Sequence, residues 1–143
     1  MRELAVGLCI RPADRALLVE HGYDRVTGAR FYRAIGGGRE PGETGVEAVV
    51  REWREEFGLE VRVVRELGSL DNRFVYEGRA GHEHVTVFEL MLCDPAVYLA
   101  VQLEGCDPTG LAHTATWVAP SALGPGAPPL YPVGVLEVLR TSG

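Results

Sequence analysis

Apolar and polar positions alternate in blocks along the chain, and most of these blocks predict β-strands. Apolar runs occupy 3–10, 15–20 and 83–93, and the last is rich in β-branched and aromatic residues. A turn is expected at 12–14 and a polar loop at 21–30. Shorter runs of the same kind predict further strands at 31–35, 59–67, 72–78 and 113–119.

The segment 44–57 repeats its apolar residues with helical spacing and is predicted to be a helix that ends at Gly58. A shorter helix is expected at 132–140, after a mostly irregular stretch at 120–132, while 94–112 is left unassigned. The face of the first helix that should pack on a sheet contains Val46, Val49, Val50, Trp53 and Phe57. Strands around two helices predict one α/β domain spanning 1–143.

Three carboxylates share the other side of the predicted helix. Glu52, Glu55 and Glu56 fall within an arc of about 100° at 100° per residue, and Ala48 is expected to leave space among them. Exposed like charges at this spacing repel by about 0.2–0.5 kcal/mol per pair, so the arc is either a solvated face or a cation site. Mg²⁺ prefers carboxylate and carbonyl oxygens, and the glycines 36–38, expected to break the chain, let backbone approach a ligand.

The segment GGREPGETGVEAVVREWREEFGL, residues 37–59, resembles the signature of the Nudix hydrolases at every fixed position. Its order is Gly, five residues, Glu, seven residues, Arg-Glu, two residues, Glu-Glu, one residue, Gly and a bulky apolar residue. Trp53 stands where the family usually has an aliphatic residue. The resemblance implies an α/β/α sandwich with a mixed β-sheet and a central catalytic helix. It also implies metal-dependent hydrolysis of a pyrophosphate bond in a nucleoside diphosphate linked to another moiety.

The same resemblance implies roles for individual residues. The carbonyl of Gly36 corresponds to a further metal ligand, and Arg51 and Glu43 correspond to charges that orient the glutamates. The implied cofactor is Mg²⁺, with Mn²⁺ as an alternative. The substrate stays open among nucleotide sugars, dinucleoside polyphosphates, ADP-ribose and nucleoside triphosphates, as do the number of metal ions and the identity of the general base, for which Glu52 is one candidate. The metal-binding glutamates that it implies are Glu52, Glu55 and Glu56.

Candidates outside the signature rest on weaker patterns. Glu83 begins a predicted strand, where it either adds a carboxylate to the metal site or belongs to a hairpin turn. His82 and His84 flank it, but no second His/Cys cluster completes a zinc site. Two arginines and two aromatic residues are candidates for binding the substrate. The alternative to substrate binding is simple surface exposure for the arginines and core packing for the aromatic residues. The candidate substrate-binding residues are Arg33, Arg39, Tyr32 and Phe74.

Composition narrows the expected partners. The chain has 14 basic residues, all arginine, against 20 acidic ones, and a formal net charge of −6. That balance disfavours nucleic acid and leaves a small-molecule nucleoside diphosphate derivative as the expected partner, with a homodimer left open. The three cysteines form no CxxC pair, and no apolar run approaches the length of a membrane span. We therefore expect a cytoplasmic protein with no membrane partner.

Two other functions compete with hydrolysis. A catalytically silent Nudix-like module that binds nucleotides or regulates would be expected to lack a catalytic glutamate, and here all are present. An acidic structural helix in a protein–protein adaptor would explain neither the glycines nor Arg51.

Overall fold

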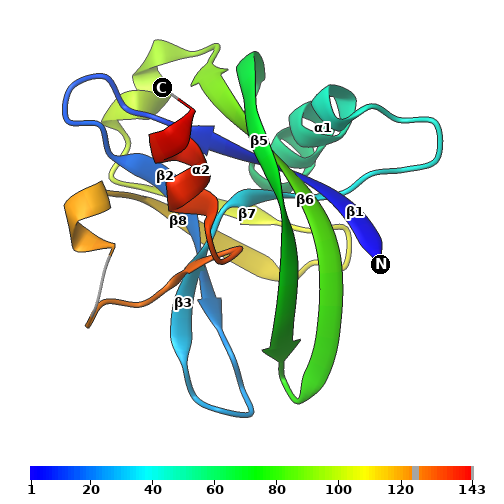
Figure 1. Cartoon of the computed structure of the whole chain (residues 1–143). Helices are drawn as coiled ribbons and strands as arrows, with labels where there is room; N and C mark the ends of the chain where they lie inside the picture. Colours follow the sequence, from blue (N-terminus) through cyan, green and yellow to red (C-terminus); the bar gives the residue numbers. More distant parts are fainter. Residues whose placement is uncertain (124–125, 143) are drawn as a thin grey trace.

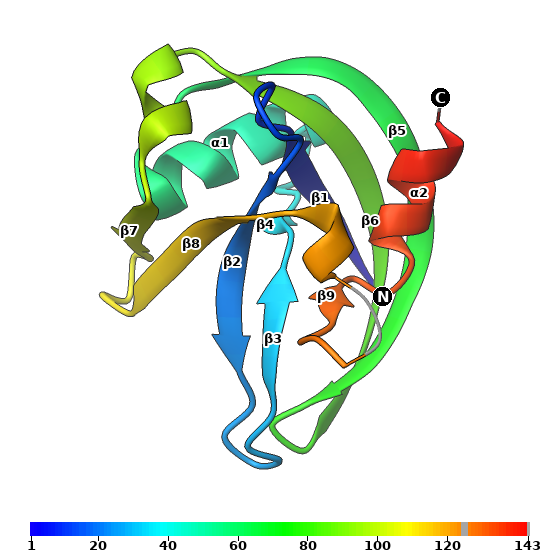
Figure 2. The ribbon, with the colours of Figure 1, turned by 90° about the vertical axis from the view of Figure 1, so that its left-hand side faces the viewer.

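The computed structural model describes residues 1–123 and 126–142, which form two mixed β-sheets and two α-helices (Figures 1 and 2). The first sheet has, in spatial order, β4 (Ile35–Gly38), β1 (Arg2–Cys9), β6 (Arg79–Leu92) and β5 (Val61–Tyr76). The second has β7 (Gln102–Cys106), β8 (Ala112–Val118), β2 (Leu17–Tyr23), β3 (Arg30–Arg33) and β9 (Leu130–Tyr131). The helices are α1 (Gly45–Phe57) and α2 (Val135–Thr141), with short 3₁₀ turns η1 (Pro95–Leu99) and η2 (Pro120–Ala122). The α/β class predicted from the sequence is confirmed.

Strand β1 is buried on both of its faces, which explains its nearly uninterrupted apolar sequence. Ala5 and Cys9 belong to a core that α1 shares, whereas Val6 and Leu8 belong to a second core that includes residues of α2. The first sheet is thus covered by a helix on each side, as Figure 1 shows. This is the α/β/α sandwich that the resemblance implied.

Helix α1 starts and stops at sequence-encoded signals. The Thr44 hydroxyl accepts a hydrogen bond from the Glu47 amide, and the Glu47 carboxylate accepts one from the Thr44 amide. At the other end Gly58 adopts the left-handed conformation, with φ of 66°. The bounds predicted for this helix are therefore right to within one residue.

Four of the five residues predicted to pack do so, since Val49 and Trp53 are buried and Val50 and Phe57 pack against the same core. The packing face of α1 is nevertheless rotated from the predicted one. Val46 is 44% exposed, while Ala48 is fully buried instead of lying open among the carboxylates. Viewed down the helix axis at 100° per residue, the buried side of the helix is bounded by Ala48 and Trp53. Glu52 and Glu56 fall between these two residues on the helical wheel. The helix therefore turns two of its carboxylates inward, and Val46 is displaced to solvent.

We expect Trp53→Ala to cost about 3–5 kcal/mol of unfolding free energy. The Trp53 side chain is fully buried, and its Nε1 donates a hydrogen bond to the Ile35 carbonyl oxygen at 2.9 Å. Urea unfolding measures the loss, and Val46→Ala on the same helix is the control, with an expected change below about 1 kcal/mol. Equal losses for the two variants would contradict the observed rotation of the helix.

Several strand predictions need correction. The glycines 36–38 do not break the chain but form most of β4, paired with β1 from Gly36–Val6 to Gly38–Leu4. The two strands predicted at 59–67 and 72–78 are the single strand β5, because irregularities near Gly68 bend the strand without ending its pairing with β6.

Bounds also shift in the remaining segments. The loop predicted at 21–30 is shorter, since β2 and β3 extend into it. The unassigned stretch 94–112 contains η1 and β7, and 120–132 contains η2 and β9, with residues 124–125 outside the described part. Helix α2 begins at Val135, three residues later than predicted.

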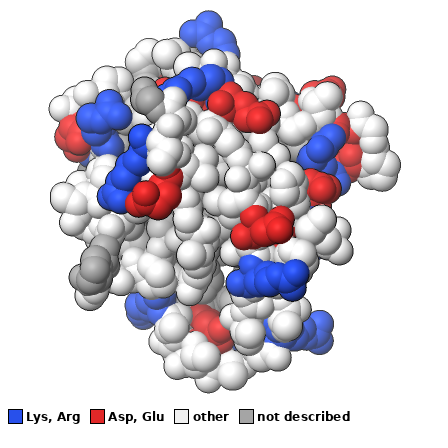
Figure 3. Space-filling model, in the orientation of Figure 1, with Lys and Arg blue, Asp and Glu red and all other residues white. Residues whose placement is uncertain are grey.

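The surface mixes charges of both signs. On the face shown in Figure 3, arginines and acidic side chains are interspersed between broad uncharged areas. Within residues 1–123 and 126–142, no helix has the length and apolar character needed to cross a membrane.

Candidate active site

A cleft of about 790 Å³ is lined by residues of the β2–β3 and β5–β6 hairpins, of β4 and of α1. The two hairpins form the lower part of the molecule in Figure 1. One end is lined by carboxylates and glycine backbone: Glu52, Glu56, Glu83 and Gly36–Gly38. Towards the hairpin tips the lining is aromatic: Phe31, Phe74, Tyr76 and Tyr131. The cleft therefore combines an acidic end with an aromatic one, whose lining also includes Asp24, Arg30 and Arg73.

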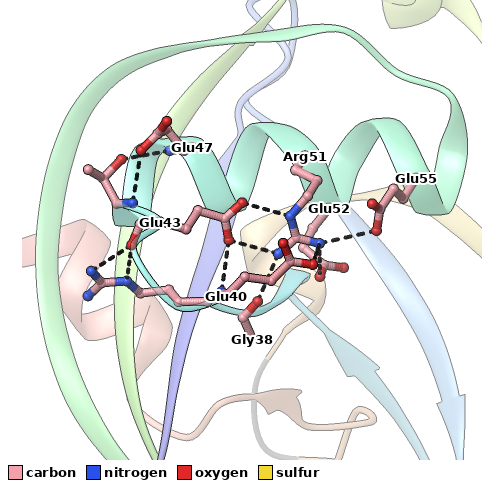
Figure 4. Close-up of polar contacts among 9 residues, drawn as sticks. Gly38, Glu40, Glu43, Glu47, Arg51, Glu52 and Glu55 are labelled. Carbon is pink, nitrogen blue, oxygen red and sulfur yellow. Dashed lines mark hydrogen bonds and ion pairs between the residues drawn. The ribbon is translucent and has the colours of Figure 1, made fainter.

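Arg51 organises the charges beside the acidic end (Figure 4). Its guanidinium donates to both carboxylate oxygens of Glu43, at 2.8 and 2.9 Å, and to the Gly38 carbonyl at 2.9 Å. It also donates to Glu52 at 3.0 Å and to Glu55 at 3.1 Å. The hydrogen bonds from Arg51 lower the pKa of Glu43 to about 2. Arg51 thus ties the helix to strand β4 and orients Glu52 and Glu55.

The Glu52 carboxylate lies directly against the backbone of Gly37. A Cβ atom at position 37 would be 2.5 Å from Glu52 Cδ, which is closer than real contacts allow. Burial raises the pKa of Glu52, although the hydrogen bond from Arg51 opposes this. Gly36 has a different reason to be glycine, because its Cβ would lie 2.1 Å from the Ala5 carbonyl oxygen in the neighbouring strand. Close approach, and not positive φ, therefore explains both glycines.

Glu56 is the most perturbed carboxyl group of the cleft. Burial, followed by the nearby charge of Glu20, raises its pKa to about 9. Its Oε2 atom is buried and has no hydrogen-bond partner among the described residues. Such an atom is costly unless something satisfies it. A divalent cation fits this need, and the carboxylates of Glu52 and Glu83 line the same cleft.

The cluster behind Glu56 was not predicted from the sequence. Glu20 is only 2% exposed, and one of its oxygens lies 2.6 Å from Arg33 Nη2 and 2.7 Å from His113 Nδ1. Burial opposes ionisation of Glu20, but Arg33 and His113 outweigh it and lower its pKa. For His113 burial works against the charged ring, yet Glu20 and Asp107 raise its pKa. The one sequence signal was a glutamate that directly follows the apolar run ALLV.

Glu20, Glu56 and His113 each offer one atom within 4.8 Å of the others, a spacing compatible with a metal ion. However, Arg33 already neutralises Glu20 in this geometry and would repel a cation there. The donor set at the cleft itself, with Glu52 and Glu56, suits a cation better. Glu20, Arg33 and His113 then act as the support that keeps Glu56 buried.

The structure brings some of the other candidates to the cleft and leaves others outside. Glu83 and Phe74 line it, and Glu83 forms a 3.5 Å ion pair with Arg2. Arg39 donates to the Glu43 backbone carbonyl, away from the cleft lining. Tyr32 packs edge-on against the His21 ring on the second sheet. Glu55 is 45% exposed and is turned towards Arg51.

The raised pKa of Glu56 predicts how the stability of the metal-free protein depends on pH. A carboxyl group with a folded-state pKa near 9 holds its proton more tightly than in the unfolded chain, so stability falls as the pH rises from about 5 to 9. One such group contributes a slope of at most about 1.4 kcal/mol per pH unit. Thermal unfolding in EDTA should show this slope for the parent and a shallower one for Glu56→Gln. His113 contributes a slope of the same sign in both proteins, so the difference between their slopes reports Glu56. Identical slopes would show that Glu56 does not have a raised pKa.

Comparisons with known proteins show the family and the fold of the chain. The family model for the NUDIX domain matches residues 1–135. Of the curated proteins compared with the chain, none matched. Among solved structures, the chain is similar to the E. coli ORF135 protein, with a TM-score of 0.65 and 23% identity over 99% of this chain and 89% of that one.

Two further structures share the fold. An ADP-ribose pyrophosphatase from Streptococcus suis has a TM-score of 0.61 and 17% identity, over 99% of this chain and 91% of that one. A UDP-X diphosphatase has a TM-score of 0.65 and 18% identity over 99% of this chain, which spans 62% of that protein. At these identities the structures establish the shared fold.

Proposed function

The chain belongs to the Nudix family, and from this premise we propose that it is a pyrophosphohydrolase that cleaves a nucleoside diphosphate linked to another moiety with the help of a divalent metal. The observation that carries the proposal is the buried Oε2 of Glu56, which has no hydrogen-bond partner in the described part of the chain and lines an aromatic-walled cleft together with Glu52. A carboxylate pair supplies oxygen ligands, and the remaining wall is suited to a nucleoside.

The metal would be held by Glu52 and Glu56, with Glu55, the Gly36 carbonyl and Glu83 as further ligands. Glu55 would have to turn from Arg51 towards the cleft, whereas Glu83 already lines it. A bound Mg²⁺ or Mn²⁺ lowers the pKa of water and offsets the charge of the phosphates. The fit rests on the donor chemistry, since all these groups offer oxygen atoms.

The protein's own groups have separate tasks in this proposal. Arg51 fixes Glu52 at the acidic end of the cleft. The raised pKa of Glu52 suits a group that accepts a proton from water. Arg33 and Arg2 line the cleft and supply guanidinium groups that can bind phosphate oxygens. Because Arg33 also pairs with Glu20, it would join the substrate phosphates to the buried cluster.

The substrate class follows from the two ends of the cleft. A diphosphate lies best at the acidic, metal-binding end, which leaves the aromatic end for a base. The structural neighbours include a UDP-X diphosphatase and an ADP-ribose pyrophosphatase, whose named substrates both contain a nucleoside diphosphate linked to another group. We therefore place nucleotide sugars and ADP-ribose ahead of dinucleoside polyphosphates and nucleoside triphosphates.

A pyrophosphatase screen tests the proposal. The panel contains members of all four classes, each assayed with Mg²⁺, with Mn²⁺ and with excess EDTA. We expect one class to be hydrolysed at the diphosphate, with activity abolished by EDTA and restored by added metal. Full hydrolysis under verified chelation would rule out the metal mechanism. Binding of a nucleotide without turnover of any substrate would instead favour a silent binding module.

A further inference from the structure

Asn72 is a buried polar residue in the cleft that the reaction described above does not use. The residue is 7% exposed, and its Oδ1 atom has no hydrogen-bond partner within residues 1–123 and 126–142. Asn72 lines the cleft from strand β5, directly opposite Glu83 of β6. A buried acceptor without a partner is costly in a folded protein. Because Oδ1 is shielded from solvent in this position, a ligand in the cleft supplies the missing donor once the amide turns towards it.

The register of β5 and β6 places Asn72 between the two ends of the cleft. Asn72 pairs with Glu83 at the acidic end. Every second pair from there towards the hairpin tip is Phe74–Gly81 and then Tyr76–Arg79. The Phe74 ring covers Gly81 so closely that a Cβ there would lie 2.2 Å from it. Asn72 is thus the polar step between the carboxylates and the aromatic wall.

Across the cleft the second sheet continues the aromatic wall. The Phe31 ring of β3 stands edge-on to Tyr76 at 6.0 Å and to Tyr131 at 5.4 Å. The hairpin tips are joined by the ion pair of Arg25 with Glu77 at 2.6 Å. A base bound among these rings would lie beyond Asn72 as seen from Glu83.

The chemistry of Oδ1 selects the part of the ligand that it contacts. A carbonyl oxygen accepts hydrogen bonds, and ionised phosphate oxygens also only accept, so Oδ1 does not pair with them. A contact of the amide nitrogen Nδ2 with a phosphate would instead strengthen the binding of ribose and deoxy forms alike. A sugar hydroxyl donates, and in a nucleoside diphosphate the sugar lies between the phosphates and the base. We propose that Asn72 accepts a hydrogen bond from a ribose hydroxyl and thereby makes the site prefer ribonucleotides to deoxyribonucleotides. The proposal rests on the placement of a nucleoside diphosphate in this cleft.

Equilibrium binding tests the proposal without turnover. Calorimetry with Mg²⁺ measures Kd for ADP, GDP, CDP and UDP, and then for the 2′-deoxy and 3′-deoxy forms of the tightest ligand. We expect the wild type to bind at least one deoxy form about tenfold more weakly. Asn72→Leu should bind the ribose and deoxy forms alike. Asn72→Asp keeps the acceptor, so it should keep the ratio even if overall affinity falls beside Glu83.

Controls separate this role from a structural one. Asp71 neighbours Asn72 but its side chain is 65% exposed, so Asp71→Ala should keep the wild-type ratio. Asn72→Leu removes an unsatisfied buried acceptor and should not lower the thermal midpoint. If it does unfold, Asn72→Ala replaces it and should show the same loss of preference.

Three results would overturn the inference: equal affinity of the wild type for ribose and both deoxy forms, an unchanged ratio in a folded Asn72→Leu or Asn72→Ala variant, or no binding of any nucleoside diphosphate. The screen for hydrolysis is separate. A wild type that shows the expected Kd pattern but hydrolyses nothing would refute the proposed reaction alone. A wild type that hydrolyses a substrate while the variants keep its ribose preference would refute only the role of Asn72.

Discussion

Glu56→Gln is expected to lower kcat by roughly 10²–10⁴-fold, the usual range for the loss of a catalytic carboxylate. The substitution is nearly isosteric, but a neutral amide is a poorer ligand for a divalent cation than a carboxylate. In the metal-free protein the same change should raise the thermal midpoint at pH 8. The parent must keep a buried carboxyl group protonated beside Glu20 at that pH, and glutamine has no such cost.

The two opposite effects are measured together, as kcat with saturating Mg²⁺ and as the thermal midpoint in EDTA. Glu60→Gln serves as the matched control, because Glu60 lies just beyond α1 and pairs with Arg54 at the surface. It should leave kcat unchanged. A Glu56→Gln protein that is less stable than the parent yet has normal kcat per folded molecule would show that Glu56 supports the fold and not the reaction.

Helix α1 shows how much a sequence can predict when the information is local. Its capping box, its terminal glycine and the spacing of Glu43, Arg51 and Glu52 all lie within one short segment. The contacts that result are also local, because Arg51 reaches Glu43, Glu52 and Glu55 from the same helix and its leading loop. Helical spacing accounts for the contact of Arg51 with Glu55, and the resemblance of this short segment to the family signature indicated the roles of Glu43 and Glu52, so these groups could be predicted without the fold.

The orientation of α1 could not be predicted in that way. A helical wheel assumes that all apolar residues face the core, and by that rule Val46 is buried and the carboxylates point to solvent. In the structure Ala48 packs against the core instead, and Glu52 and Glu56 are drawn in beside it. The cleft between helix and sheet lowers the cost of turning the carboxylates inward. Because the cleft is formed by the whole fold, this orientation could not be read from the helix alone.

Residues from distant strands were missed for a similar reason. Glu20 in β2 meets His113 in β8 and Arg33 in β3 only because these strands belong to one sheet. Asn72 meets the cleft only because β5 runs on without a break past Gly68. The sequence suggested two separate strands there, so the alternation of inward residues could not be followed across the join. Long-range pairing, and not local propensity, sets these positions.

The second large expected effect is that of a substitution in β4, where the neighbouring glycines 36 and 37 contact different parts of the protein. Gly37→Ala is expected to weaken the activating metal's apparent affinity by roughly 10–100-fold and to lower kcat, while the fold persists. The three atoms nearest to the new Cβ would all belong to the carboxylate end of Glu52, at 2.5 to 2.7 Å, and that flexible end can move aside. Moving it breaks the alignment with Arg51, which is the arrangement that presents Glu52 to the cleft.

Gly36→Ala provides the contrast within the same strand. Its Cβ would meet Ala5 and Val6 backbone atoms at 2.1 and 2.6 Å, which cannot move without disturbing the pairing of β4 with β1. That variant should therefore lose stability, whereas Gly37→Ala should keep nearly the parent thermal midpoint. The measurements are metal titration of activity and thermal unfolding for both proteins. If Gly37→Ala keeps both the metal dependence and kcat of the parent, Glu52 does not need its observed position, and the glycine would serve only the packing of β4 against the helix.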